Sequence, residues 1–211
     1  WTLRLDSIFF PISSDKLTLD EPTHLTWNAQ KGDLQLDRLV VSDSYGNWAG
    51  ASGVFSPKGA LNAHLNFQCN ALPNALASID STLQVTNVKG DVRINGNYDA
   101  PEFAADLRLD QWKWQGFEGQ NSKCTGFGLL ESPHLIFLTD LPPNGTMRIE
   151  ADLPIDNPAA WSAEVRLNQF ALNTINHWLP DESIAVMGAA DALVWIEDFR
   201  GVPKIRGNLT T

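Results

Sequence analysis

The residues that most often do chemistry are scattered through this 211-residue chain. The four histidines stand apart from one another and from any serine or cysteine in a recognisable nucleophile setting. They are His24, His64, His134 and His177. The stretch "GASGVFSPKG" lacks the nucleophile elbow of hydrolases, and "GFGLLES" is a glycine-rich run with no helical pattern after it. We therefore predict that the protein is not an enzyme.

The two cysteines, Cys69 and Cys124, do not indicate a metal site either. They form no CxxC motif, and no histidine stands at ligand spacing from them, whereas zinc sites need clustered Cys and His ligands. We predict that the chain binds no metal and no cofactor. Two states of the cysteines remain open. Two buried free thiols are favoured over one disulfide, which would require an oxidising compartment.

Tryptophan is the third residue type that could form a functional site, and the chain contains eight tryptophans. Trp112 and Trp114 share one side of a predicted strand, with Lys113 on the other side. Such a pair could stack against sugar rings as a flat platform. We prefer the alternative that both rings fill a core or the floor of a trough, because large aromatic side chains bury the most area per residue.

The composition is that of an acidic, folded protein. Its 25 acidic residues outnumber 15 basic residues, the formal net charge is -10, and no local cluster of Lys and Arg occurs. Phosphate binding needs concentrated positive charge, so we predict that nucleic acid is not a partner. The hydrophobic content of 43% is ample for a core in one large or two smaller β domains.

The lengths of the apolar runs and the two ends of the chain indicate whether this sequence contains a membrane anchor. No apolar run reaches the ~20 residues of a transmembrane helix. The chain begins at Trp1 and ends with "GNLTT", both inside alternating patterns. We interpret it as a segment of a longer protein, with any membrane anchor or export signal outside it.

The elements that position these residues are predicted to be strands. In 103–110, apolar residues alternate with polar or small residues, and similar runs recur along most of the chain. Turn motifs such as "QKGD", "SPKG" and "PPNG" separate the runs by two to six residues. Short connections favour antiparallel neighbours, so we predict a mainly β, antiparallel meander. Its apolar faces could pack together as a closed β-sandwich, or remain apart and cover something else.

Two stretches have helical periodicity instead. They are "NALPNALASID" at 70–80 and "FALNTINHWLPDE" at 170–182, whose apolar residues recur at spacings of three and four. These apolar residues are Leu72, Leu76 and Ile79 in the first stretch, and Leu172, Ile175 and Leu179 in the second. We predict two short helices that dock by these stripes, since neither is long enough to be stable alone.

The order of these elements resembles that of a known family. The relevant stretches are "GALNAHLNFQCNALPNALA", "KGDVRINGNYDAPEFAADLRL", "WSAEVRLNQFALNTINHWLP" and "GAADALVWIEDFRGVPKIRGNL", which cover most of residues 59–209. "DLQLDRLVVSDSYGNWAGASGVFS", which ends in a small-residue strand, fits the same pattern. The arrangement resembles the TamB family of the AsmA-like group. We divide the chain accordingly into first strand pairs (1–58) and two repeat-like segments (59–158 and 159–211).

The resemblance implies an elongated sheet curled into an open hydrophobic trough, the β-taco. Members of the family are inner-membrane-anchored proteins of diderm bacteria that cross the periplasm. They are associated with carrying phospholipid to the outer membrane, and TamB itself with outer-membrane protein assembly beside its partner TamA. For this chain, the implied location is the periplasm and the implied cargo is phospholipid or another hydrophobic molecule, including a hydrophobic polypeptide.

Candidate groove residues are those that lie mid-strand on the apolar side of each alternating run. They are Leu61, Leu65, Phe67, Phe103, Leu107, Leu109, Met147, Ile149, Leu153, Val165, Leu167, Val194 and Ile196. In the leading interpretation, these residues line a lipid conduit that does no chemistry. The alternatives are a carbohydrate-binding β-sandwich that uses Trp112 and Trp114, and a structural or protein-docking spacer.

Overall fold

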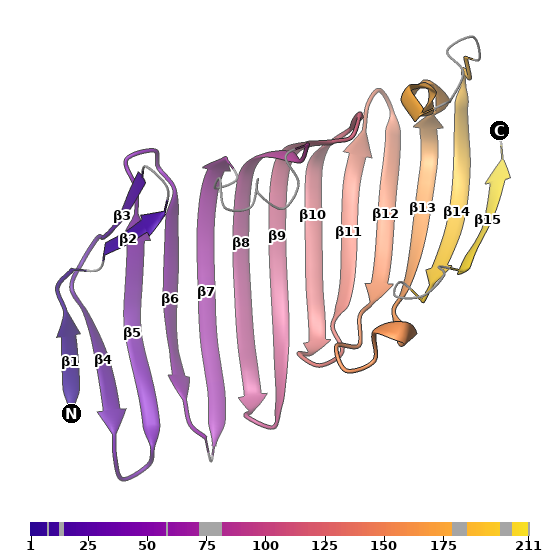
Figure 1. Cartoon of the computed structure of the whole chain (residues 1–211). Helices are drawn as coiled ribbons and strands as arrows, with labels where there is room; N and C mark the ends of the chain where they lie inside the picture. The colour runs from indigo at the N-terminus through magenta and orange to yellow at the C-terminus, as the bar shows by residue number, and fades with distance from the viewer. Residues whose placement is uncertain are drawn as a thin grey trace.

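The described residues form one 15-stranded sheet, seen along its length in Figure 1. The structure is a computed structural model, and it describes residues 1–7, 9–12, 15–57, 59–71, 82–178, 185–198 and 204–210. The first six strands are β1 (Thr2–Leu5), β2 (Phe9–Ile12), β3 (Asp15–Leu19), β4 (Thr23–Asn28), β5 (Asp33–Ser42) and β6 (Trp48–Phe55). The next five are β7 (Ala60–Ala71), β8 (Gln84–Asn97), β9 (Ala100–Trp114), β10 (Phe117–Leu129) and β11 (His134–Leu141). The last four are β12 (Gly145–Asp152), β13 (Ser162–Ala171), β14 (Ala189–Glu197) and β15 (Lys204–Thr210).

The strands follow one another across the sheet almost in chain order. From β4 to β15 each strand pairs antiparallel with the next, and β1 pairs with β4 at the other edge. The hairpin of β2 and β3 lies off this path and joins it through β5. The predicted antiparallel meander is therefore confirmed. The closed β-sandwich is not what forms, because the strands make a single open sheet whose first and last members lie at opposite ends (Figure 1).

The register gives the sheet one apolar and one charged face. Across β7, β8 and β9, Leu65 lies opposite Val92, which lies opposite Ala105. We call the side that carries this row the apolar face, and the opposite side the charged face. Strands pair across both predicted segment boundaries, since β6 pairs with β7 and β12 with β13.

Of the two predicted helices, only the second falls largely within the described residues. In the first stretch, Asn70 and Ala71 end β7, and 72–80 lies outside the described residues. In the second, the strand β13 continues to Ala171, and a short 3₁₀-helix, η2 (Leu172–Trp178), follows it. The prediction of an amphipathic helix over 170–182 was therefore wrong in type and start. A second 3₁₀ turn, η1 (Pro158–Ala160), begins with a proline, which suits a first helical position.

Three strands are kinked near the same end of the sheet. Asn87, Asn121 and Gln169 have φ of 50°, 51° and 50°, in the left-handed region that strand residues rarely adopt. Asn121 and Gln169 coincide with register shifts, the signature of a β-bulge. Each of the three residues is tied to an aspartate on the next strand. A bulge of this kind turns the side chains beyond it onto the other face.

Candidate functional site on the apolar face

The apolar face contains two hollows, which we call the first and the second. The first hollow has a volume of about 300 Å³ and lies over β5 to β8. Its apolar side chains are Leu34, Leu36, Ala51, Val54, Phe55, Leu61, Ala63, Leu65, Val92 and Ile94. Leu65 remains 42% exposed there, so few side chains shield this part of the apolar face from solvent.

The second hollow is larger, about 580 Å³, and lies over β8 to β13. Ligand pockets in proteins commonly have volumes of 300–1,000 Å³, so it is large enough for a small ligand. Every residue that lines it is apolar or aromatic. They are Leu83, Val85, Leu109, Trp112, Trp114, Phe117, Phe137, Leu141, Met147, Ile149, Val165, Leu167, Phe170 and Ile175.

Alternation also breaks on β9, beside the kink of β8. Leu109 and Trp112 lie three positions apart on β9, so strict alternation would place them on opposite faces. Both nevertheless line the hollow. Between them, the Asp110 carboxylate accepts a hydrogen bond of 2.8 Å from the side-chain amide of Asn87, the kinked residue of β8.

The other two kinks are held in the same way. The side-chain amide of Asn121 donates to Asp140 at 3.0 Å, and the backbone N–H of Gln169 donates to Asp191 at 2.7 Å. Phe170, beyond the kink of β13, and Leu141, which follows Asp140 on the regular strand β11, are buried at 9% and 6% exposure and line the hollow. Among the described residues, this end of the sheet therefore supplies part of the buried core.

Hydroxyl groups fix the orientation of Trp112. Its indole N–H lies 3.0 Å from Ser122 Oγ and 3.1 Å from Thr139 Oγ1, and both hydroxyls are buried. Ser122 Oγ donates to Thr139 Oγ1 at 2.7 Å, and the Thr139 hydroxyl lies 3.2 Å from the Gln120 carbonyl oxygen. Buried polar groups are stabilising only when they are paired, and these hold the ring with its apolar surface toward the hollow.

The helix η2 supplies one more wall residue, Ile175, to the second hollow. Its neighbour Asn176 binds the backbone of Val186 twice, donating to the carbonyl at 3.0 Å and accepting from the N–H at 2.8 Å. The N–H of Leu172 donates to the Gly188 carbonyl at 3.0 Å. These bonds tie η2 to the segment that leads into β14.

Of the predicted groove residues, seven line a hollow. Leu61 and Leu65 line the first hollow, and the second takes Leu109, Met147, Ile149, Val165 and Leu167. Five more lie on the rows of the apolar face but outside both hollows: Phe67, Phe103, Leu107, Val194 and Ile196. Leu153 lies just past the end of β12, where its N–H donates to the Pro133 carbonyl at 3.0 Å.

Sequence reasoning missed the residues beyond the kinks. Val85, Phe117 and Phe170 line the second hollow without being groove candidates, and so do Phe137 and Leu141 on the regular strand β11. The available signal was an Asn inside otherwise strand-like runs, in "QVTNVKG" and "EGQNSKC", because Asn adopts the left-handed region more readily than most residues. Trp112 and Trp114, considered above as a sugar platform or a trough floor, also line this hollow.

Both cysteines are free thiols, on strands that are not neighbours. Cys69 lies on β7 and Cys124 on β10, with β8 and β9 between them. Three strand spacings amount to roughly 14 Å, whereas the Cα atoms of a disulfide lie within ~7 Å. Burial raises the pKa of both thiols, and for Cys69 the Asp43 carboxylate raises the pKa further.

The charged face has its ionic side chains in rows. Lys89, Arg108 and Lys123 lie opposite one another on β8, β9 and β10, and Arg148 lies opposite Arg166 on β12 and β13. Leu138 on β11 joins the two groups, since it lies opposite both Lys123 and Arg148. We call these five cations the cation row. Local sequence did not show this clustering, because each cation comes from a different strand.

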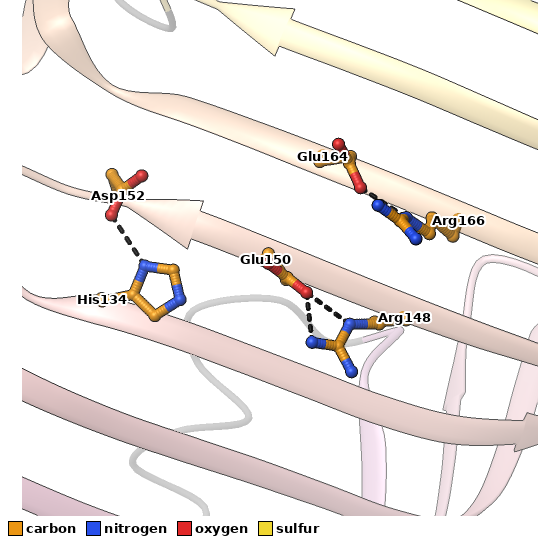
Figure 2. A network of polar contacts seen from close by, with 6 residues as sticks. All are labelled: His134, Arg148, Glu150, Asp152, Glu164 and Arg166. Carbon is orange, nitrogen blue, oxygen red and sulfur yellow. Dashed lines mark hydrogen bonds and ion pairs between the residues drawn. The ribbon is translucent and has the colours of Figure 1, made fainter.

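A row of acids runs beside the cations, two positions along each strand. It consists of Asp91, Asp106, Glu150 and Glu164, and we call it the anion row. Figure 2 shows Arg148 reaching Glu150 and Arg166 reaching Glu164 on the same strand, and His134 reaching Asp152 on the next. The Lys123 ammonium, 2.9 Å from Asp106, holds the pKa of that carboxyl below its usual range, and Arg166 does the same for Glu164.

No metal cluster and no membrane helix emerge from the described ranges. Within them, no three His, Cys, Asp or Glu side chains gather closely enough to hold a metal ion. Among the same residues, no helix is both long and apolar enough to cross a membrane. Comparisons with family models, with curated proteins and with solved structures found no match to this chain.

Proposed function

We propose that the apolar face holds the acyl chains of phospholipid, as one segment of a periplasmic conduit between the inner and outer membranes. The observation that carries this proposal is the second hollow, about 580 Å³ in volume and lined only by apolar and aromatic side chains. The resemblance to the TamB family supports the same cargo and location. In this proposal the membrane anchor and an outer-membrane partner such as TamA lie outside the chain.

The energetics suit a hydrocarbon cargo. Burying one CH₂ group is worth ~0.8 kcal/mol, so a chain of about 15 methylenes gains roughly 12 kcal/mol on leaving water. That gain offsets most of the cost of withdrawing a lipid tail from a bilayer. A surface of this kind needs no specific polar ligands, and the hydroxyls beside the second hollow are already paired with Trp112.

The same pairing disfavours the sugar platform. Carbohydrate sites combine a stacking ring with hydrogen-bond donors and acceptors that fix the sugar's orientation. The indole N–H of Trp112 is directed to Ser122 and Thr139 instead of toward a ligand. On the side of the hollow, the residues that line it with Trp112 are all apolar or aromatic.

Mass spectrometry of organic extracts from the purified chain tests the proposal. We expect co-purified phospholipid, which Val165→Arg should abolish by placing a charge in the second hollow. The matched control is Asn168→Arg, on the same strand but at an exposed position of the charged face. It should keep its lipid.

Circular dichroism of each variant separates binding from folding. In an open trough the introduced charge stays solvated, so Val165→Arg should remain folded. Unfolding by Val165→Arg would mean an ordinary packed core, since an unpaired buried charge costs several kcal/mol. Lipid-free wild-type protein that binds oligosaccharide would establish the carbohydrate alternative.

A further inference from the structure

The charged face carries a pattern that the proposed conduit does not use. Like charges lie directly opposite one another in both rows, as Arg148 does Arg166 and Glu150 does Glu164. Cross-strand like-charge pairs destabilise a sheet, whereas opposite charges in the same positions would stabilise it. The arrangement therefore costs stability that a mixed order of the same side chains would avoid.

Ion pairs within the chain offset only part of this cost. Arg108 lies 3.2 Å from Asp106, and Arg166 lies 2.5 Å from Glu164. The side chains are 69% and 38% exposed in the first pair, and 56% and 26% in the second. The cations therefore protrude above the acids, and solvent-exposed pairs of this type are individually worth little.

The two rows make the surface complementary to itself. They run parallel, two residues or about 7 Å apart along the strands. Consider a second copy facing the first, related to it by a twofold axis that runs parallel to the rows and midway between them. This axis places the cations of each copy over the acids of the other on β8, β9, β12 and β13, and places Lys123 on β10 over Thr125. Arg148 then faces Glu150 of the other copy, and Arg166 faces Glu164.

The positions without charge also match under this axis. On β11, Leu138 would face Ile136 of the other copy, and on β14, Leu193 would face Trp195. Leu138 is 39% exposed, so an apolar contact is available to it. Apolar contacts between charged flanks are typical of protein interfaces. The match extends from β8 to β14, six strand spacings or roughly 29 Å.

We propose that the charged face is a docking surface for a second copy of this chain, paired row to row about this twofold axis. An anionic polymer fits less well, because it would lie only about 7 Å from the anion row while it follows the cation row. A second copy carries both rows and meets no such repulsion. Screening weakens exposed ion pairs, so the association depends on salt.

Sedimentation velocity of the whole chain tests the proposal. We expect a dimer at low ionic strength that dissociates in about 1 M salt, where the Debye length is ~3 Å. An acidic variant, Arg148→Glu with Arg166→Glu, should self-associate at least about 10-fold more weakly, because acids then face acids. A basic variant, Glu150→Arg with Glu164→Arg, should self-associate equally weakly, because cations then face cations.

Mixing these two variants should restore the dimer, because each then offers the charges that the other lacks. All four substitutions combined exchange the rows over β12 and β13, keep the net charge, and should dimerise like the wild type. This exchanged variant is the matched control. If the acidic variant does not fold, the same reversal at Lys89 and Arg108 on β8 and β9 takes its place.

Three results would overturn the proposal: a wild-type chain that stays monomeric at low salt, a mixture that does not associate, or an exchanged variant that does not dimerise. Binding of heparin that the acidic variant loses and the basic variant strengthens, without self-association, would assign the surface to an anionic polymer instead. The proposed conduit is tested separately, since lipid retention on the apolar face does not depend on these substitutions.

Discussion

The first and second hollows occupy the same face of one sheet, yet they are built differently. The first lies over β5 to β8 and is lined mainly by aliphatic side chains, and β5 and β6 shift register between Leu36 and Leu39 beneath it. The second lies over β8 to β13, where kinked strand ends bring Trp112, Trp114 and Phe170 beside its floor. A bulge by itself therefore does not deepen the sheet; the second hollow, nearly twice as large, gains its aromatic wall where left-handed residues lie near the strand ends.

The largest expected difference between the hollows is in stability. Phe170→Ala should lower the free energy of unfolding by ~3–5 kcal/mol, because Phe170 is buried at 9% exposure and packs 6.1 Å from the ring of Phe117. Phe55→Ala in the first hollow should cost only ~1–2 kcal/mol, since Phe55 is only partly buried and packs edge-on against Tyr98. Urea unfolding followed by circular dichroism measures both.

Phe170→Leu keeps the comparison measurable if the alanine variant does not fold, and should cost less than Phe170→Ala. Equal losses for Phe55→Ala and Phe170→Ala would mean that the kinked end is no better packed than the flat part of the sheet.

The two hollows also differ in how far sequence could predict them. Alternation located Leu61 and Leu65 in the first hollow and Ile149 and Val165 in the second, because side chains on a regular strand have a period of two. The same rule failed at Val85 and Phe170. A single left-handed residue reverses the face of everything beyond it, and alternation cannot register that change.

The charged rows illustrate a different limit. Each of Lys89, Arg108, Lys123, Arg148 and Arg166 is an isolated cation in its own stretch of sequence. The rows exist only once the register between strands is known, because register decides which residues lie opposite one another. The meander itself was predictable, since short turns leave little choice of neighbour.

A second, smaller effect should appear in the hydroxyl cluster that distinguishes the second hollow. Thr139→Val keeps the shape of the side chain but removes the oxygen that Ser122 and Trp112 approach at 2.7 and 3.1 Å. We expect a loss of ~1–2 kcal/mol in urea unfolding and a shift in tryptophan emission, because a buried hydroxyl loses its acceptor. The control Thr125→Val lies on the charged face and should change stability by less than ~0.5 kcal/mol. Similarly small losses of stability for Thr139→Val and Thr125→Val would contradict the role of the hydroxyl cluster in fixing Trp112.

The smallest expected difference is in the reactivity of the two thiols, Cys69 on β7 and Cys124 on β10. Thiolate is the reactive form, so the raised pKa values of Cys69 and Cys124 should make both react with an alkylating reagent more slowly than a free cysteine at pH 8. For both, burial comes first among the causes, but the Asp43 carboxylate adds to the shift at Cys69. Added salt screens that carboxylate and should speed the alkylation of Cys69, while leaving Cys124 unchanged.

The sign of the accompanying pH effect follows from the same shifts. Because the folded pKa values are raised, the folded chain keeps its thiol protons when the unfolded chain begins to lose them near pH 8.5. Stability should therefore be full below that pH and fall slightly as the pH rises through the folded pKa values. Mass spectrometry of Cys69→Ala and Cys124→Ala assigns each alkylation rate to its thiol. Each substitution should also reduce the loss of stability at alkaline pH. A salt-dependent alkylation rate at Cys124 would contradict the role given to Asp43. Fewer than two reactive thiols in the denatured, unreduced chain would contradict the fold, since β7 and β10 are too far apart for a disulfide.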